Sequence, residues 1–363
     1  MTKREVKVKG KVVVGMSGGV DSSVAAYLLK EEGYEVIGVT LKHLGDEDSE
    51  NTNTKTCCSL DDIHDAKMTC FKLGIPHYVI NTVDPFEKEV INYFIGEYSN
   101  GVTPSPCVIC DEKIKIKKLA EAADRLGADY ISTGHYCDVA YSEELGSHLL
   151  KLSKSAAKDQ TYMLYRIGEE VLKRMLFPLK NLEKNRVREI AKEAGISIHN
   201  KKDSQGICFA PEGYKELLKR HLGEKIKPGN FVTKDGTVLG KHEGYQLYTI
   251  GQRRGLGINF PKVYFIIEID PDKNEIILGD FEDLMKKEVE LTDSVFLADI
   301  EKLEKIKLLG RPRFSSTGLS GRLKKIGDSV FFIYDEENAR NSPGQHMVIY
   351  YNDLVIGGGK IIF

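Results

Sequence analysis

The segment that most constrains this chain is a glycine-rich turn between an apolar run and a helix. Residues 11–16 read as a short apolar strand, and Gly15-Met16-Ser17-Gly18-Gly19-Val20-Asp21-Ser22 overlaps its end and opens the helical pattern. Glycines let backbone N–H groups approach a phosphate closely, and the N-terminus of the next helix adds a partial positive charge. The pattern predicts an anion-binding turn, although a plain strand-to-helix turn with an Asp or Ser cap would use similar residues. It is neither a Walker loop nor the dinucleotide fingerprint G-x-G-x-x-G.

Short β-rich runs alternate with amphipathic helical stretches from residue 11 to about residue 195. This alternation is typical of an α/β domain whose helices cover both faces of a parallel sheet. One helix is expected to start near Asp111, and Ser59 with Asp62 fits a capping box at the start of another. The expected strands are residues 11–16, 36–41, 78–81 and 130–133.

The composition and periodicity of the sequence change after about residue 202. Glycine and proline become frequent, and short alternating segments replace the helical pattern. These features predict a small β-rich central domain followed by a closed or nearly closed C-terminal antiparallel β-barrel. We therefore expect three domains, residues 1–203, 204–282 and 283–363.

Composition excludes several classes of protein. Of the 363 residues, 41% are hydrophobic and 29% are charged, which is ordinary for a globular chain and argues against wholesale disorder. The formal charge of -2 means that a nucleic-acid partner must be held by a local basic patch. No apolar run approaches the roughly 20 residues of a membrane helix, and no signal-peptide core is visible, so we expect no membrane partner and a cytoplasmic location.

The seven cysteines suit a reducing compartment, because their number is odd and their spacing is irregular. Cys107 and Cys110 form a Cys-x-x-Cys in a proline-rich segment just before the helix expected near Asp111, where a thiol pKa should be lowered. Cys208 lies in a separate glycine turn, and the two loops could meet over one ligand. Three cysteines are one ligand short of a closed structural zinc site. Cys70 and Cys137 read as small buried side chains, and Cys57 and Cys58 stay undecided.

Basic side chains gather beside the cysteine pair and in the β-rich half. Phe314 next to Arg313 offers an aromatic face for a base, as recognition of single-stranded RNA favours. Without further support these charges would read as an ordinary solvated face. The basic residues in question are Lys113, Lys115, Lys117, Lys118, Arg253, Arg254, Arg311, Arg313, Arg322, Lys324 and Lys325.

Seven motifs, in order along nearly the whole chain, resemble the bacterial tRNA-specific 2-thiouridylase family of the ATP-pyrophosphatase superfamily. They are Ser-Gly-Gly-Val-Asp-Ser, Pro-Cys-x-x-Cys, Thr133-Gly134-His135-Tyr136, Lys158-Asp159-Gln160-Thr161-Tyr162, Asp203-Ser204-x-Gly206-Ile207-Cys208-Phe209, Gly251-Gln252-Arg253-Arg254-Gly255-Leu256-Gly257 and Pro343-Gly344-Gln345. The resemblance implies ATP with Mg²⁺, bound by Gly15, Met16, Ser17, Gly18, Gly19, Val20, Asp21, Ser22, Leu41 and Gly134. It also implies contacts with tRNA from Ser105, Pro106, Cys107, His135, Lys158, Asp159, Gln160, Arg313, Phe314 and Gln345.

The same resemblance assigns the sulfur chemistry to cysteines. It implies that Cys110 is the nucleophile, that Cys208 carries a persulfide, and that the two can form an alternate disulfide. Many family members have Asp where this chain has Cys107, so Cys107, Cys110 and Cys208 could instead hold a [4Fe–4S] cluster, since thiolates are its preferred ligands. The sulfur donor would be a cysteine desulfurase, a relay protein or inorganic sulfide.

The implied reaction is thiolation of the wobble uridine in the tRNA anticodon stem-loop. ATP would adenylate the uridine O2, and sulfur would then attack C2. Two other classes remain open: an ATP-dependent ligase or amidotransferase acting on a small molecule, and an RNA-binding module without catalysis. The first would not need the cysteines, and the second would leave the glycine turn unused.

Overall fold

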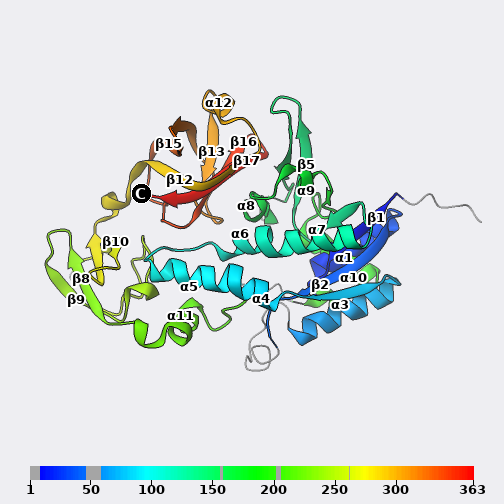
Figure 1. Ribbon diagram of the computed structural model, residues 1–363, viewed down its shortest axis with the longest axis horizontal. Helices are drawn as coiled ribbons and strands as arrows, with labels where there is room; N and C mark the ends of the chain where they lie inside the picture. Colours follow the sequence, from blue (N-terminus) through cyan, green and yellow to red (C-terminus); the bar gives the residue numbers. More distant parts are fainter. Residues whose placement is uncertain (1–8, 46–58, 156–157, 202–205, 261) are drawn as a thin grey trace, which may run out of the picture. The chain divides into compact units, whose positions relative to one another are not determined.

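The computed structural model describes residues 9–45, 59–155, 158–201, 206–260 and 262–363. The chain divides into two compact units, one of residues 1–90 and 107–211 and the other of residues 91–106 and 212–363 (Figure 1). The first unit carries the glycine-rich turn and the described cysteines. The second consists mainly of β-structure.

A parallel sheet forms the centre of the first unit, in the strand order β3-β2-β1-β4-β7. The four strands expected from the sequence are present, and the short edge strand β7 was missed. The strand bounds are β1 Lys11–Gly15, β2 Glu35–Lys42, β3 His77–Asn81, β4 Tyr130–Ser132 and β7 Met175–Leu176.

Helices cover both faces of this sheet, as the alternating pattern predicts. Val12, Val14 and Met16 pack with residues of α1 and α3, whereas a Cβ on Gly15 would meet Leu119 of α7 at 2.8 Å. Because successive strand residues point to opposite faces, α7 lies on the face opposite α1 and α3. The helix bounds are α1 Val20–Glu31, α3 Leu60–Leu73, α7 Lys117–Arg125 and α10 Lys184–Glu193, the last packed on α1.

Shorter elements complete the first unit. The capping box expected at Ser59 and Asp62 is present at the start of α3. An antiparallel hairpin of β5 and β6 was not expected from the sequence. The bounds are α4 Val83–Phe86, η1 Glu87–Ile91, α6 Pro106–Cys110, η2 Asp111–Ile116, β5 Cys137–Ser142, β6 Ser147–Leu152, α8 Thr161–Leu164, α9 Glu169–Leu172 and η4 Ser197–Asn200, with η1 and η2 being π-helical.

The central part of the second unit is a four-stranded sheet in the order β10-β11-β8-β9. Phe231 and Ile276 on neighbouring strands are fully buried, so this sheet has its own core. The elements here are α5 Asn92–Ser99, α11 Tyr214–Leu222, η5 Gly223–Lys225, β8 Gly229–Thr233, β9 Val238–His242, η6 Tyr245–Leu247, β10 Phe265–Asp270, β11 Glu275–Gly279 and η7 Phe281–Leu284.

The C-terminal strands close into an antiparallel barrel, which confirms the expected architecture. Pairings run from β12 through β15, β14, β13, β16 and β17 and return to β12, so no edge among these strands is left open. The bounds are β12 Lys286–Phe296, α12 Ile300–Leu303, β13 Leu308–Arg311, β14 Leu319–Ile326, β15 Ser329–Asn338, β16 His346–Tyr351 and β17 Leu354–Ile362.

Candidate functional site

The glycine-rich turn joins β1 to α1 and is held in place by its own hydroxyl groups. The Ser22 hydroxyl donates to the Gly19 carbonyl over 3.1 Å and accepts from the Ser17 backbone N–H over 3.2 Å. Gly18 has a φ of 69°, and a Cβ there would lie 2.2 Å from the carbonyl oxygen of Asp62. Glycine is therefore required at position 18 both by the backbone conformation and by the close approach of α3.

The predicted nucleotide residues lie at the carboxyl ends of neighbouring strands. Met16 donates its N–H to Val39 of β2 over 2.8 Å, close to Leu41 near the end of that strand. On the other side, a Cβ on Gly134 would meet the backbone nitrogen of Ser22 at 2.7 Å. This is the point where the order of the strands reverses, which is the usual ligand crevice of an open α/β sheet.

Two lysines beside the turn were missed by the sequence analysis. Lys184, the first residue of α10, donates to Asp21 over 2.7 Å. Lys201 donates to the Gly18 carbonyl over 3.0 Å and to the carboxylate of Asp62 over 2.6 Å. These lysines lie 163 and 183 residues from their partners in the turn, so no local pattern could have placed them there.

The cysteine pair occupies a helix rather than the segment before one. The sequence analysis expected this helix to start near Asp111, but α6 already begins at Pro106. Proline suits the first helical position because its missing N–H would have no helical partner there. Cys107 and Cys110 therefore both lie within α6, and the helical path continues through η2 into α7.

The expected lowering of the thiol pKa is wrong for Cys110. This side chain is 4% exposed, and burial raises its pKa well above the ordinary value, while Lys115 acts in the opposite direction. Asp111, Cys208 and Cys107 raise the pKa further. Cys110 is not at the helix start, which is Pro106, and removal from water disfavours its thiolate.

An ion pair with a buried carboxylate follows Cys110 in the helix. Lys115 contacts the carboxylate of Asp111 over 2.9 Å, and the Asp111 side chain is 2% exposed. Burial lowers the pKa of Lys115, but Asp111, Cys110 and Cys107 together outweigh burial, and the pKa is raised well above the ordinary value. Lys115 therefore stays charged beside the thiol.

His135 lies between the cysteine helix and the glycine turn. Its Nε2 is 3.8 Å from Asp111, and its Nδ1 is 2.9 Å from the Thr133 hydroxyl. Burial lowers its pKa, and the charges of both Asp111 and Asp21 act on it in the opposite direction. Because Gly134 packs against Ser22, residues 134 and 135 connect the two parts of the site within one unit.

Cys208 lies in a turn whose neighbours pack against α4. Phe209 contacts Phe86 edge-on with ring centroids 5.7 Å apart, and Phe86 stacks on His43 at 4.8 Å. Burial lowers the pKa of His43 to about 3, so this ring is neutral at physiological pH. Cys208 lies near enough to Cys110 for its charge to raise the Cys110 pKa.

The described cysteines are free thiols. Cys70 and Cys137 are fully buried, as expected, and burial raises the pKa of Cys70 to about 12. Among the described residues, no three His, Cys, Asp or Glu side chains are arranged to hold one metal ion. Cys57 and Cys58 lie outside the described residues.

Several side chains expected to contact tRNA in the first unit hold the local structure. The Asp159 carboxylate accepts from the Ser153 N–H over 3.0 Å and from the Thr161 hydroxyl over 2.6 Å. Gln160 accepts from the backbone N–H of Tyr136 over 3.0 Å. Lys158, beside them, is half-buried.

The residues of the second unit that were expected to contact tRNA form two groups. Gln345 donates to the carbonyls of Thr103 and Pro104 over 3.2 and 3.0 Å, and so holds the segment that leads to Ser105 and buried Pro106. Phe314 is 43% exposed. Its carbonyl accepts from Arg311 over 2.7 Å, while Arg313 lies beside Gly251 of the second glycine-rich motif.

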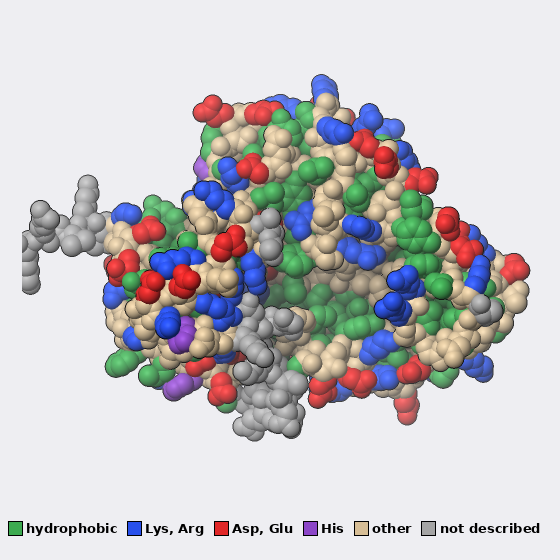
Figure 2. Space-filling view, turned by 180° about the vertical axis from the view of Figure 1, so that it is seen from behind, with side chains coloured by type: hydrophobic (Ala, Val, Ile, Leu, Met, Phe, Trp, Pro, Cys, Tyr) green, Lys and Arg blue, Asp and Glu red, His purple; other side chains and the backbone are tan. Residues whose placement is uncertain are grey.

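The charged surface is mixed in sign. Figure 2 shows aspartate and glutamate side chains mostly toward the edges of the visible face, whereas lysine and arginine also occur among hydrophobic side chains in its middle. A polyanion would therefore meet local clusters of cations, as the net charge predicts. Within the described ranges, no helix is long and apolar enough to cross a bilayer.

Comparisons with known proteins cover almost the whole chain. Residues 10–212 match the tRNA methyl transferase HUP domain, residues 215–280 the tRNA methyl transferase PRC-barrel domain, and residues 286–361 the aminomethyltransferase beta-barrel domain. Among solved structures, the complex of a 4-thiouridine synthetase with RNA and bound ATP aligns with 59% of this chain and 51% of its own, at 20% identity and a TM-score of 0.36.

Curated relatives are far more similar. The tRNA-specific 2-thiouridylase MnmA 2 of Fusobacterium nucleatum is 54% identical over 97% of this chain and 99% of its own length. The tRNA-specific 2-thiouridylase MnmA of Clostridioides difficile is 46% identical over 97% and 98%. With this identity over nearly complete lengths, and with all three domain models in order, the chain belongs to the tRNA-specific 2-thiouridylase family.

Proposed function

We propose that this protein is a tRNA-uridine 2-sulfurtransferase that uses ATP to thiolate the wobble uridine of tRNA. The observation that carries this proposal is the connection through residues 134 and 135 between the glycine turn and the cysteine helix. It puts a phosphate-binding turn and a set of thiols into one α/β unit. The names of the relatives supply the substrate, a uridine of tRNA.

The nucleotide part of the reaction belongs to residues 15–22 with Leu41 and Gly134. The N–H groups at the start of α1 bind phosphate oxygens, and Lys184 and Lys201 add positive charge as pyrophosphate leaves. Mg²⁺ would neutralise the triphosphate, and Asp21, the carboxylate of the turn, would be its protein ligand. One such protein ligand is usual for Mg²⁺, which keeps most of its water.

Sulfur delivery belongs to Cys110 and Cys208. The uridine O2 first attacks the α-phosphorus of ATP and releases pyrophosphate. The terminal sulfur of a Cys208 persulfide then attacks C2, and AMP leaves with the oxygen. The Cys110 thiolate finally attacks the inner sulfur, which releases 2-thiouridine and leaves a Cys110–Cys208 disulfide for an external thiol to reduce.

The base must leave the anticodon stack to reach this site. The groups proposed to hold the RNA are Ser105, Pro106, Cys107, His135, residues 158–160, Arg313, Phe314 and Gln345. Phe314 is exposed enough to stack on a base, whereas Asp159, Gln160 and Gln345 act through the loops that they hold. Free thiols suit a reducing compartment, so we place the protein in the cytoplasm.

A [4Fe–4S] cluster on Cys107, Cys110 and Cys208 is the second candidate for the sulfur carrier. The closeness of these three thiols, two of which act electrostatically on Cys110, supports it, although the described residues hold no ready-made set of metal ligands. Anaerobic purification with iron and acid-labile sulfide analysis separates the two carriers. Iron-free protein that still thiolates tRNA would exclude the cluster.

The function itself is tested by incubating the protein with unmodified tRNA, ATP, Mg²⁺ and either sulfide or a cysteine desulfurase. Mass spectrometry of the nucleosides should show 2-thiouridine, with one AMP and one pyrophosphate formed for each sulfur transferred. AMP formation with a small acid or amine in the absence of tRNA would identify a ligase instead. An absence of ATP binding in calorimetry would leave an RNA-binding module.

A further inference from the structure

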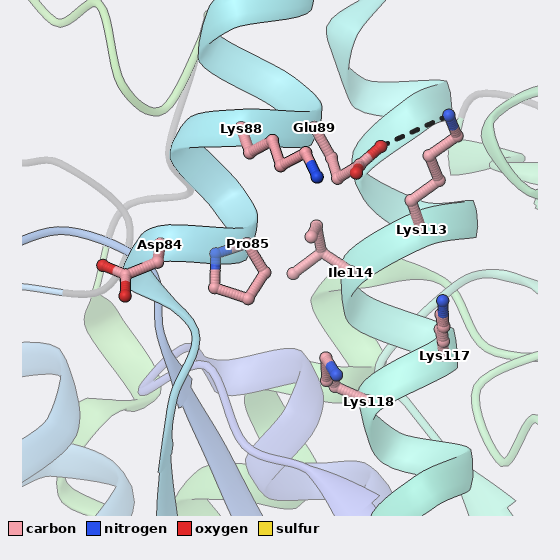
Figure 3. Close-up of a pocket in the computed structure, with 8 residues that line it drawn as sticks. All are labelled: Asp84, Pro85, Lys88, Glu89, Lys113, Ile114, Lys117 and Lys118. Atoms are coloured by element: carbon pink, nitrogen blue, oxygen red, sulfur yellow. Dashed lines mark hydrogen bonds and ion pairs between the residues drawn. The ribbon is translucent and has the colours of Figure 1, made fainter.

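A pocket rich in lysine lies on the surface of the first unit, and three of its lysines are among the basic residues noted in the sequence without an assigned role. Its volume is about 540 Å³, and two helical segments form its walls. Figure 3 shows α4 and η1 on one side and η2 and α7 on the other, with lysine side chains from both walls. The lining residues are Asp84, Pro85, Lys88, Glu89, Lys113, Ile114, Lys117 and Lys118.

Positive charge exceeds negative charge in this pocket, because four lysines face only two carboxylates. Lys113 forms an ion pair with Glu89 over 3.4 Å, and Lys118 with Glu121 over 2.8 Å. Lys88 and Lys117 are exposed and form no ion pair with any residue that the structure describes. These two ammonium groups are therefore available to an anion.

Both walls of the pocket contain π-helical turns. Lys88 and Glu89 belong to η1, and Lys113 and Ile114 belong to η2. π-helical turns are rare, and they occur frequently at functional sites. Because two such turns face each other across this pocket, they indicate that the pocket binds a ligand.

The same two walls also build the cysteine site. The second wall is the helical path that carries Cys110, and Lys117 follows Cys110 by seven positions on that path. In the first wall, Phe86 contacts Phe209 next to Cys208, and its neighbour Pro85 lines the pocket. An RNA strand with one base near Cys110 therefore has its adjoining backbone within reach of this pocket.

We infer that the lysine pocket binds backbone phosphates of the tRNA next to the reacting uridine, an inference that rests on the proposed function. Lysine is a compact point charge suited to phosphate oxygens of varied orientation. Pro85 and buried Ile114 give the pocket an apolar floor on which a ribose can lie. No aromatic side chain lines it, so it holds the backbone and does not read the base.

The test is the salt dependence of tRNA binding by the full-length protein with Lys88→Ala and Lys117→Ala combined. Removing two phosphate contacts with a single strand should reduce the slope of log K against log salt by about 1.4. At 0.1 M salt the affinity should fall about 25-fold, since each contact with a single strand contributes about 0.7 to that slope. The matched control combines Lys67→Ala and Lys192→Ala, two exposed lysines of the same unit, and should keep the wild-type slope.

Each outcome bears on a different claim. Wild-type protein that binds no tRNA would overturn the proposed function and this inference together. A double variant that matches the control in slope and affinity would overturn the pocket alone. The pocket would also be reassigned, to an acidic protein partner, if the variant bound tRNA normally and lost activity only with a desulfurase and not with sulfide.

Chemical acetylation of the lysines, measured by mass spectrometry, distinguishes binding of RNA from binding of a free phosphate compound. Micromolar tRNA should protect Lys88 and Lys117 from acetylation, and inorganic pyrophosphate at the same concentration should not. Protection by pyrophosphate without protection by tRNA would make the pocket a site for a small anion and overturn the inference.

Discussion

The glycine turn and the cysteine helix lie in the same unit but are prepared for their chemistry to different degrees. Around the turn, hydroxyl groups already hold the backbone, and two lysines lie beside it. Around Cys110, burial keeps the thiol protonated, because it raises the thiol pKa well above its ordinary value. The proposed phosphate binding would need no rearrangement of the hydrogen bonds that hold the turn, whereas the proposed sulfur chemistry would need a change at the thiol.

This difference has a chemical reason. A phosphate site gains most from donors that are fixed before the charge develops. A thiolate that was permanently exposed would be oxidised or alkylated without substrate, because susceptibility follows thiolate character and exposure. A buried thiol flanked by the charged pair Lys115 and Asp111 can be activated by a small shift in their balance.

The largest effect should come from removing the thiol. Cys110→Ala should lower thiolation at least a thousandfold, because no other described group can replace the sulfur nucleophile. Binding of ATP and tRNA should stay near wild type, measured by calorimetry. Cys70→Ala removes a buried thiol of α3 that is not one of the proposed sulfur carriers, and it serves as the control for loss of a buried thiol. Thiolation by Cys110→Ala at the level of that control would contradict the assignment.

The next effect should come from distorting the turn. Gly18→Ala brings a Cβ into the space of the Asp62 carbonyl, so the turn must shift, and kcat/KM for ATP should fall about a hundredfold. Gly127→Ala is the matched control, since Gly127 has a φ of 61° with nothing within 4 Å of a Cβ. Equal losses in the two variants would show that backbone strain alone, and not the contact with α3, determines the result.

A smaller effect should follow from removing one lysine at the turn. Lys184→Met should raise KM for ATP about ten- to a hundredfold, the range of one charge-assisted hydrogen bond. Lys192→Met, on the exposed side of the same helix, should leave KM unchanged. If Lys184 only holds Asp21, the variant will lose stability in urea unfolding while its KM for ATP stays near the wild-type value.

Local patterns predicted the parts of this molecule whose determinants are close in sequence. The strands, the capping box at Ser59 and the glycine turn depend on neighbouring residues, and the barrel follows from alternating runs. Lys184 and Lys201 could not be found in this way, because only the packing of α10 and η4 against α1 brings them to the turn. The thiol pKa of Cys110 was misjudged for a related reason: its burial is a property of the packed unit, whereas the helix-start argument used only the local sequence.

The smallest effect concerns the charge balance at Cys110. Because its pKa is raised, its alkylation by iodoacetamide should keep accelerating about tenfold per pH unit up to pH 9, followed by peptide mass spectrometry. Lys115→Met should slow this alkylation about tenfold and Asp111→Asn should accelerate it about tenfold, since a neighbouring charge shifts a pKa by a unit or more. A general loosening of the fold would accelerate alkylation in both variants. Opposite changes in the alkylation rate would therefore show that the ion pair sets the reactivity of the thiol. Parallel changes would show that burial alone distinguishes the cysteine helix from the glycine turn.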